Sequence, residues 1–334
     1  LTAYYDSVIS EYLNIENKDY FPQRKTIYGN LVEILRYGEN PHQKSAIYSK
    51  NNILDISKLS GKKLSYNNYN DVYAALNISR TLPKNTGTVI IKHANPCGVS
   101  ANSSKIESYK EALACDPISA FGGIVSCNFK VNKKIALELN KIFFEVIIGL
   151  GFDKDSLKIL KKKKNLRLID SSNLKEDNLF NIVTNNESLL IQSLDNKIFT
   201  KDNFKVVSKI KPSKKIFDDL LFAFNICRNV KSNAIVLTKN RSTIGIGSGQ
   251  PSRLDSCKIA IDKMKKFQKI SENEIIIGAS DAFFPFVDGV ETLVQNGVSA
   301  IIQPSGSIRD KEIIKFADKV GIILVFSKTR HFKH

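Results

Sequence analysis

Short runs of β-branched residues alternate with helical segments along most of this chain, and this alternation constrains its fold more than any other feature. Strand-like runs include "TVII" (88–91), "GGIVSCN" (122–128) and "AIIQPSG" (300–306). Helical spacing of apolar residues is found between such runs, as in "DVYAALNISRTL" (71–82) and "NKKIALELNKIFFEV" (132–146). Strands that alternate with helices are typical of layered α/β structure. The sequence therefore predicts an α/β protein.

The length of 334 residues suggests about two domains at roughly 150 residues each. The polar stretch 171–188 is the best candidate boundary, which predicts a first lobe over 30–171 and a second over 172–334. The opening "TAYYDSVISEYL" has helical spacing, and a polar connector follows it. Because the chain begins at Leu1 and its only methionine is Met264, we expect residues 1–29 to be the tail of a preceding unit and a linker.

The net charge is strongly positive, with 50 Lys plus Arg against 33 Asp plus Glu, or +17. This balance favours anionic partners, among them nucleic acid, acidic membranes and phosphorylated or carboxylated metabolites. The lysine run "KILKKKKNLRL" (158–168) has no interleaved aromatics, so it indicates a solvated helix face or loop rather than a nucleic-acid groove. Composition alone does not choose among the anionic partners.

The five cysteines are widely spaced and never form a Cys-x-x-Cys pair. This pattern predicts neither a disulfide framework nor a zinc ribbon, and it fits a reducing cytoplasm. No apolar run approaches the roughly 18 residues of a membrane span, and the opening lacks the features of a signal peptide. We therefore expect a cytoplasmic protein without a membrane partner.

The stretch "TVIIKHANPCGVS" (88–100) places Lys92 and His93 at the end of a buried strand. Asn95 before Pro96 is pushed out of helical geometry and Gly98 permits a tight turn, so the chain is expected to break at this point. In open α/β sheets, ligands bind at the carboxyl ends of strands. The pair is therefore a candidate site, and the alternative is a solvated lysine beside a hydrogen-bonded histidine.

Other islands are rich in residue types that a packed core does not need. "LRYGENPHQ" (35–43) concentrates donors suited to an anion, and "CDPISAFGGIV" (115–125) has glycines that let a ligand approach the backbone. "IGIGSGQPSR" (244–253) offers glycines and a serine before a helix, which is a plausible phosphate seat. Taken singly, each island could equally be a tight turn.

"HANPC" (93–97) shares its histidine and its Pro-Cys step with zinc deaminases. Asn95 stands where those enzymes need a glutamate, and no cysteine follows Cys97 at the required spacing. The stretch therefore predicts no zinc site.

Nine motifs in chain order carry a family resemblance: "LRYGENPHQ", "LSYNNYND", "KHANPCGV", "DPISAFGGIV", "VKSNAIV", "IGIGSGQPSR", "SDAFFPFVDGVE", "QPSGSIRD" and "TRHFKH". From about residue 30 to the C-terminus, the chain closely resembles the AICAR transformylase region of the bifunctional AICAR transformylase/IMP cyclohydrolase family. Residues 1–13 resemble the tail of the cyclohydrolase domain.

The resemblance implies two α/β/α lobes of cytidine-deaminase-like topology without zinc. It implies transfer of a formyl group from 10-formyltetrahydrofolate to the 5-amino group of AICAR (5-aminoimidazole-4-carboxamide ribonucleotide) in purine biosynthesis. It also implies a homodimer with active sites at the subunit interface, a monovalent cation as a candidate ligand, and no nucleic-acid partner. A zinc nucleoside deaminase-like enzyme, which shares the expected fold, is the alternative.

The resemblance also implies the site residues. Lys92 and His93 match the catalytic pair, and Asn233 matches an asparagine near the transferred formyl group. The residues that match nucleotide contacts are Arg36, Tyr37, Asn68, Phe121, Gly122, Arg253, Phe284, Arg330 and His334. Glu145 and Asp281 fall where carboxylates line the folate side. Val287 departs from the family, which commonly has a basic residue there.

Overall fold

The first lobe is built around strands that are buried on both faces. The computed structural model describes residues 2–334 except 51–52, 55, 175–179 and 272. In β4, Val89, Ile90 and Ile91 are all fully buried, which explains the continuous apolar run. The elements of this lobe are β3 (Ser57–Ser60), α2 (Tyr66–Thr81), β4 (Gly87–Lys92), β5 (Asn95–Ala101), α3 (Lys105–Cys115), α4 (Pro117–Ala120), β6 (Ile124–Cys127), α5 (Lys133–Leu139), β7 (Val146–Gly149), α6 (Lys154–Leu160) and β8 (Arg167–Asp170).

The second lobe repeats this layering with its own helices. Phe224 on one helix and Val236 on the following strand are fully buried in one apolar cluster. The elements are the 3₁₀ helix η1 (Lys201–Asn203), β11 (Phe204–Val206), α7 (Lys214–Cys227), β12 (Ile235–Lys239), β13 (Ser242–Gly247), α8 (Arg253–Phe267), β14 (Ile276–Ser280), α9 (Val287–Gln295), β15 (Val298–Pro304), α10 (Asp310–Val320) and β16 (Ile323–Ser327).

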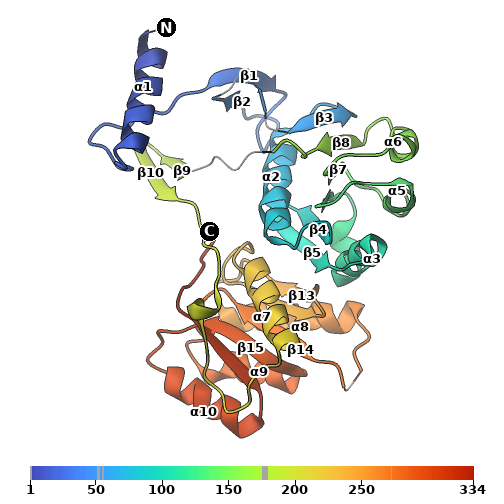
Figure 1. Ribbon diagram of the computed structural model, residues 1–334, viewed down its shortest axis with the longest axis vertical. Helices are drawn as coiled ribbons and strands as arrows, with labels where there is room; N and C mark the ends of the chain where they lie inside the picture. The colour runs from blue at the N-terminus through green and yellow to red at the C-terminus, as the bar shows by residue number, and fades with distance from the viewer. Residues whose placement is uncertain (1, 51–52, 55, 175–179, 272) are drawn as a thin grey trace.

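Both lobes share one mixed sheet, which has twelve strands among the described residues (Figure 1). Its strand order is β11-β16-β15-β14-β12-β13-β5-β4-β6-β7-β8-β3. Helices α2 and α7 pack in a single apolar cluster that spans both lobes, whereas α3 and α8 belong to separate clusters on the other face. The predicted α/β class is therefore confirmed, and the sheet lies between helical layers.

The seam between the lobes is the pairing of β5 with β13. Its ladder has one register pair, Ser100 with Ser242, whereas β4 and β5 pair over six positions. The two seryl Oγ atoms lie 2.7 Å apart, and both contact Oε2 of Glu111. Side chains thus supply much of the polar contact at a place where the backbone ladder is short.

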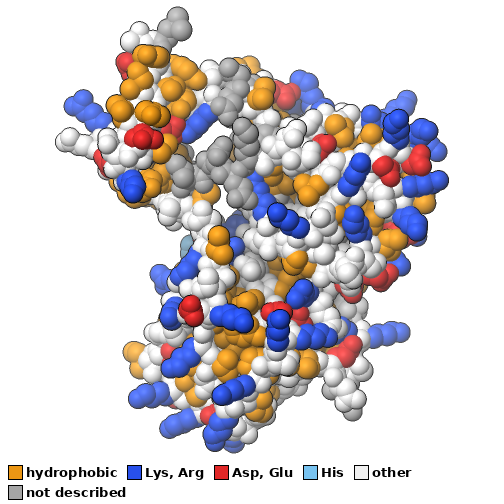
Figure 2. All heavy atoms as spheres, viewed as in Figure 1, with side chains coloured by type: hydrophobic (Ala, Val, Ile, Leu, Met, Phe, Trp, Pro, Cys, Tyr) orange, Lys and Arg blue, Asp and Glu red, His pale blue; other side chains and the backbone are white. Residues whose placement is uncertain are grey.

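Three further elements extend from the lobes: helix α1 (Thr2–Glu16), the hairpin β1 (Asn30–Leu35) and β2 (Ser45–Ser49), and the hairpin β9 (Phe180–Asn185) and β10 (Ser188–Ser193). No residue of α1 is buried, and Figure 2 shows hydrophobic side chains gathered over it. The rings of Tyr20 and Phe21 lie 6.1 Å and 5.9 Å from that of Phe180, so the segment after α1 contacts the second hairpin. None of the described helices is long and apolar enough to cross a membrane.

Two local predictions were wrong. The segment from Asn95 was expected to be a break in the chain, but it forms strand β5. Gly98 lies inside this strand, and only glycine fits there, because a Cβ would lie 1.8 Å from the carbonyl oxygen of Ala112. The helix expected over 132–146 ends at Leu139, and β7 follows it. The predicted boundary in the polar stretch 171–188 stays a prediction; strand β9 lies within this stretch, and residues 175–179 are outside the described part.

Candidate active site

The Lys92–His93 pair lies in the hairpin that joins β4 to β5. Lys92, the last residue of β4, pairs with Asn95, the first residue of β5. The two residues between them, His93 and Ala94, have φ angles of 53° and 57°. Two consecutive residues with positive φ are the signature of a type I′ hairpin turn. The turn takes His93 out of the strand pleat, so its side chain is exposed while Lys92 is half-buried.

Lys92 is oriented by the segment that follows α4. Its Nζ donates a hydrogen bond to the carbonyl oxygen of Phe121 at 2.8 Å. The ring of Phe121 is 59% exposed, and Gly122 adopts a φ of 75°, which favours glycine. The structure therefore brings three predicted site residues together, and two Nζ protons of Lys92 remain available to a ligand.

Helix α2 contacts the same hairpin through a residue that the sequence analysis did not single out. Asp71 Oδ1 accepts a hydrogen bond from the backbone N–H of Ala94 at 2.6 Å. Burial raises the pKa of Asp71, and hydrogen bonding to the backbone of the turn offsets only part of that effect. Asp71 belongs to the motif "LSYNNYND", but its contact with the turn at Ala94 is apparent only in the structure.

One turn before Asp71, Asn68 holds a carboxylate of the expected folate side. Its Nδ2 donates to Glu145 Oε2 at 2.8 Å, and Arg167 Nη1 lies 3.6 Å from the same oxygen. Asn68 is itself buried, and its side chain also completes the capping box of α2 with Ser65. Arg167, which the sequence analysis did not single out, completes this group.

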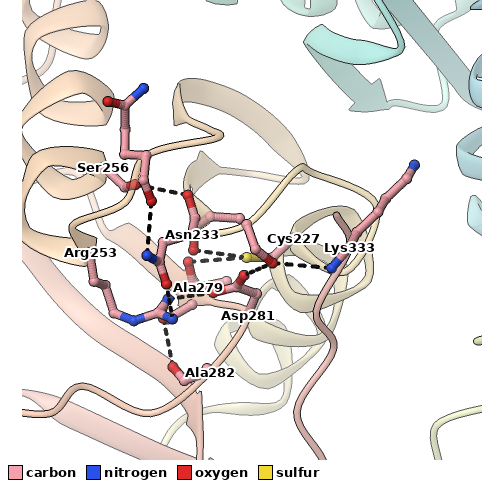
Figure 3. A network of polar contacts seen from close by, with 12 residues as sticks. Cys227, Asn233, Arg253, Ser256, Ala279, Asp281, Ala282 and Lys333 are labelled. Atoms are coloured by element: carbon pink, nitrogen blue, oxygen red, sulfur yellow. Dashed lines mark hydrogen bonds and ion pairs between the residues drawn. The ribbon is translucent and has the colours of Figure 1, made fainter. Parts of the chain in front are cut away.

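A second polar group lies at the ends of β12 and β14, around Arg253 (Figure 3). The guanidinium forms a buried ion pair with Asp281, which is fully buried, and donates to Asn233 Oδ1 at 2.6 Å. The other carboxylate oxygen of Asp281 accepts from Ser232 Oγ at 2.6 Å. Arg253 is the first residue of α8, so the start of this helix fixes the whole group.

The amide of Asn233 is nearly saturated by protein partners. Its Nδ2 donates to the carbonyl oxygens of Gln250 at 2.8 Å and Pro251 at 2.9 Å, and its Oδ1 accepts from Arg253. An amide has two donor protons and two acceptor lone pairs, so one lone pair on Oδ1 remains. In this geometry Asn233 is available to a ligand as an acceptor.

The C-terminal segment is anchored against this group. Ser232 and Lys333 exchange hydrogen bonds, from Ser232 N to the Lys333 carbonyl and from Lys333 N to Ser232 Oγ. His331 is 3% exposed, and its Nδ1 lies 2.6 Å from Asp195 Oδ2. Burial alone would raise the pKa of Asp195, but the hydrogen bond and charge of His331 outweigh it and lower that pKa. The anchored segment leaves Arg330 exposed beside the site.

The two polar groups are joined through Asn95. Its Oδ1 accepts a hydrogen bond from the backbone N–H of Lys231 at 3.2 Å. Because Asn95 pairs with Lys92 and Lys231 is two residues before Asn233, the hairpin of the first lobe meets the loop of the second. The predicted catalytic residues thus come from adjoining parts of two lobes.

Some predicted site residues lie elsewhere. Arg36 and Tyr37 lie in the turn after β1, which is tied to α2 by the hydrogen bond from Asn67 Nδ2 to the carbonyl of Glu39. Phe284 is 1% exposed and packs within an apolar cluster, so its ring does not face a ligand; its neighbour Phe283 is partly exposed. The assignment of Phe284 to nucleotide contact therefore does not fit the structure.

Metal-binding groups are not evident near the hairpin. Across the described residues, no three His, Cys, Asp or Glu side chains are grouped so that they could hold a metal ion. Cys97 is buried, and burial together with the charge of Asp116 raises the pKa of its thiol to about 12, which disfavours the thiolate that binds metals.

The comparison with known proteins identifies the family. A sequence model described as the AICARFT/IMPCHase bienzyme family matches residues 1–263. The chain belongs to this family. It is also similar to curated proteins named bifunctional purine biosynthesis protein PurH, at 43% identity over 341 residues in Petrotoga mobilis and 44% over 336 residues in Leptospira biflexa.

These relatives are longer than the chain. In both alignments, 100% of the chain corresponds to 65% of the relative's length. Membership of the AICARFT/IMPCHase family confirms the resemblance carried by the nine motifs, whereas the zinc deaminase alternative gains no support.

Proposed function

We propose that this chain is an AICAR formyltransferase, which transfers the formyl group of 10-formyltetrahydrofolate to the 5-amino group of AICAR in purine biosynthesis. The observation that carries the proposal is the meeting of the Lys92–His93 hairpin with the loop that bears Asn233. Family membership supports the same reaction. The excess of 17 positive charges suits a nucleotide and a carboxylated folate as substrates.

The amine of AICAR is a weak nucleophile because its lone pair is conjugated with the imidazole ring. It must be aligned with the formyl carbon and must lose a proton as it attacks. His93 is exposed on its turn, and its neutral imidazole accepts that proton. Lys92, with two free Nζ protons, stabilises the tetrahedral oxyanion or protonates the departing folate nitrogen.

Asn233 has a narrower role than its residue type suggests. Because both of its Nδ2 protons are donated to backbone carbonyls, it offers the substrate only the remaining Oδ1 lone pair. That acceptor suits the N–H of the attacking amine and orients its lone pair toward the formyl carbon. Arg253 and Asp281 act through Asn233, since both are buried and bonded within the same group.

The remaining contacts follow from exposure. The exposed or partly exposed residues that we assign to the nucleotide are Arg36, Tyr37, Phe121, Gly122, Arg330 and His334, with Phe283 in place of Phe284. Asn68 and Arg253 are buried, so we assign them indirect roles in the same site, through Glu145 and Asn233. Arg36 and Arg330 are exposed cations suited to the phosphate. Glu145 is partly exposed and is assigned to the folate side; Asp281 is fully buried, so its influence on folate passes through Arg253.

The division into lobes, the N-terminal segment and the assembly are part of the same proposal. We assign residues 30–171 and 172–334 to two lobes of cytidine-deaminase-like topology without zinc, and residues 1–29 to the tail of a cyclohydrolase domain and a linker. A cytoplasmic homodimer with interface sites and a bound monovalent cation complete the assignment. The exposed apolar residues of α1 are consistent with a neighbouring unit that covers them.

The test is to mix the purified chain with AICAR and 10-formyltetrahydrofolate and to follow tetrahydrofolate formation. We expect tetrahydrofolate and formyl-AICAR in equal amounts, with no turnover when AICAR is left out. Deformylation of the folate at the same rate without AICAR would refute the proposal, because the formyl group would then pass to water.

A further inference from the structure

We propose that Asp71 is a positioning residue that holds the turn at His93 in the conformation required for formyl transfer. The inference rests on the proposed function, because it concerns the orientation of the residue that takes the amine proton. It assigns to Asp71 no contact with either substrate.

The turn needs an external support because its residues are poorly suited to it. Both central positions of a type I′ turn have positive φ, and glycine is strongly preferred at the second. The second position here is Ala94, whose φ is 57°, and the first is His93, whose φ is 53°. Side chains with a Cβ disfavour this region through contact with the backbone, so the local sequence alone favours other conformations.

Asp71 supplies that support through the backbone of the turn. Its Oδ1 accepts a hydrogen bond of 2.6 Å from the N–H of Ala94, the second of the two residues with positive φ. A charged acceptor forms stronger hydrogen bonds than a neutral one. This bond fixes the plane of the peptide link between His93 and Ala94, and it thereby restrains the direction in which the His93 side chain leaves the chain.

Helix α2 is a rigid base for this carboxylate. It begins with a complete capping box at Ser65 and Asn68, and Val72 and Ala75, on the turn that carries Asp71, are fully buried. The same helix holds Glu145 through Asn68. Through Asp71 and Asn68, α2 thus sets the turn and the expected folate side relative to each other.

The test combines Asp71→Ala with Ala94→Gly. Removal of the carboxylate should lower kcat by about 10²-fold, the loss expected when a reacting group is displaced by roughly 1 Å, with a change of less than about threefold in the KM for AICAR. Glycine at position 94 makes the turn stable without support, so the double variant should recover most of the lost kcat. Ala94→Gly alone should keep kcat within about threefold of the original.

A matched control is Asp153→Ala. Asp153 also accepts a backbone N–H, that of Ser156 at 2.6 Å, but it caps α6 beyond the far end of β7. This variant should lose stability on thermal melting and keep its kcat. A folded Asp71→Ala with normal kcat, or one that Ala94→Gly does not rescue, would overturn the proposal; the second result would mean that the carboxylate acts on the substrates directly.

A readout without substrate separates this inference from the proposed function. The chain has four histidines, so selective ¹⁵N-histidine labelling gives few amide signals, and His93→Gln identifies the one at the turn. In Asp71→Ala, the signal of the His93 amide should shift in the spectrum, because the turn that carries it loses its support. If the original chain transferred no formyl group, the proposed function would fail, and an unchanged His93 amide in Asp71→Ala would still refute the role of Asp71.

Discussion

The buried group around Arg253 allows a quantitative test of how the second lobe holds Asn233. We consider Asp281→Ala, Arg253→Met and the double variant. Asp281 is fully buried and pairs with Arg253, which is 9% exposed. Removal of one partner leaves the other charge buried without compensation, which typically costs about 3–5 kcal/mol.

The double variant should cost much less than the sum of the single variants. Once both charges are gone, no uncompensated ion remains, and the methionine fills much of the arginine volume. The remaining cost is that of the unpaired polar groups of Ser232 and Asn233, at about 1–3 kcal/mol for each buried group. We therefore expect the unfolding free energies of the two single variants to be coupled by at least about 2 kcal/mol.

The assay is urea unfolding of the four proteins, with tetrahydrofolate formation measured in parallel. Stability should recover in part in the double variant, whereas activity should not, because Asn233 has lost the donor that orients its Oδ1. The reasoning would be refuted if the losses of unfolding free energy in the two single variants summed to the loss in the double variant within about 0.5 kcal/mol. Normal activity in the double variant would remove Arg253 from the orientation of Asn233.

Three further outcomes are expected. Lys92→Ala and His93→Ala should each lower kcat by about 10²-fold or more, with AICAR affinity less affected by Lys92→Ala; steady-state kinetics of folded variants checks this, and undiminished kcat would exclude the residue from the mechanism. Gly98→Ala should lower the unfolding free energy by about 3 kcal/mol in a urea titration, because the added Cβ would meet a backbone oxygen. Gly278→Ala is the control: the nearest atoms to its added Cβ are side-chain atoms at 3.3–3.7 Å, so it should cost about 1 kcal/mol or less in the same titration. Because its pKa is lowered in the folded state, ionised Asp195 stabilises the fold at pH values above the ordinary aspartate range, and this contribution is lost as pH falls through the folded-state pKa. Between pH 6 and pH 3, the melting temperature of Asp195→Asn should therefore fall less steeply with pH than that of the original chain, and equal slopes would contradict this expectation.

The predictable part of the fold is the part set by local patterns. Buried strands such as β4, and helices with apolar spacing such as α2, were apparent because their neighbours in sequence decide them. The strand from Asn95 was missed because proline and glycine are normally poor strand residues. The structure shows that Gly98 is required there by close packing against α3, which is a tertiary cause that no local pattern carries.

The candidate site divides in the same way. Lys92 and His93 were apparent as an unusual pair at a strand end, and the nine motifs supplied the other predicted site residues. Asp71 and Arg167 were not singled out, because each acts through a residue distant in sequence, Asp71 on the turn at Ala94 and Arg167 on Glu145. The misassignment of Phe284 has a similar origin, since only packing distinguishes it from Phe283.

The seam between β5 and β13 joins the two lobes more through side chains than through its backbone ladder. The hydroxyl groups of Ser100 and Ser242 share Oε2 of Glu111, and the apolar cluster that contains residues of α2 and α7 continues from one lobe into the other. The first strand of the seam begins at Asn95, beside the turn that carries His93. The spacing between His93 and Asn233, the proposed reacting groups, therefore depends on packing across this seam as well as on the structure within each lobe.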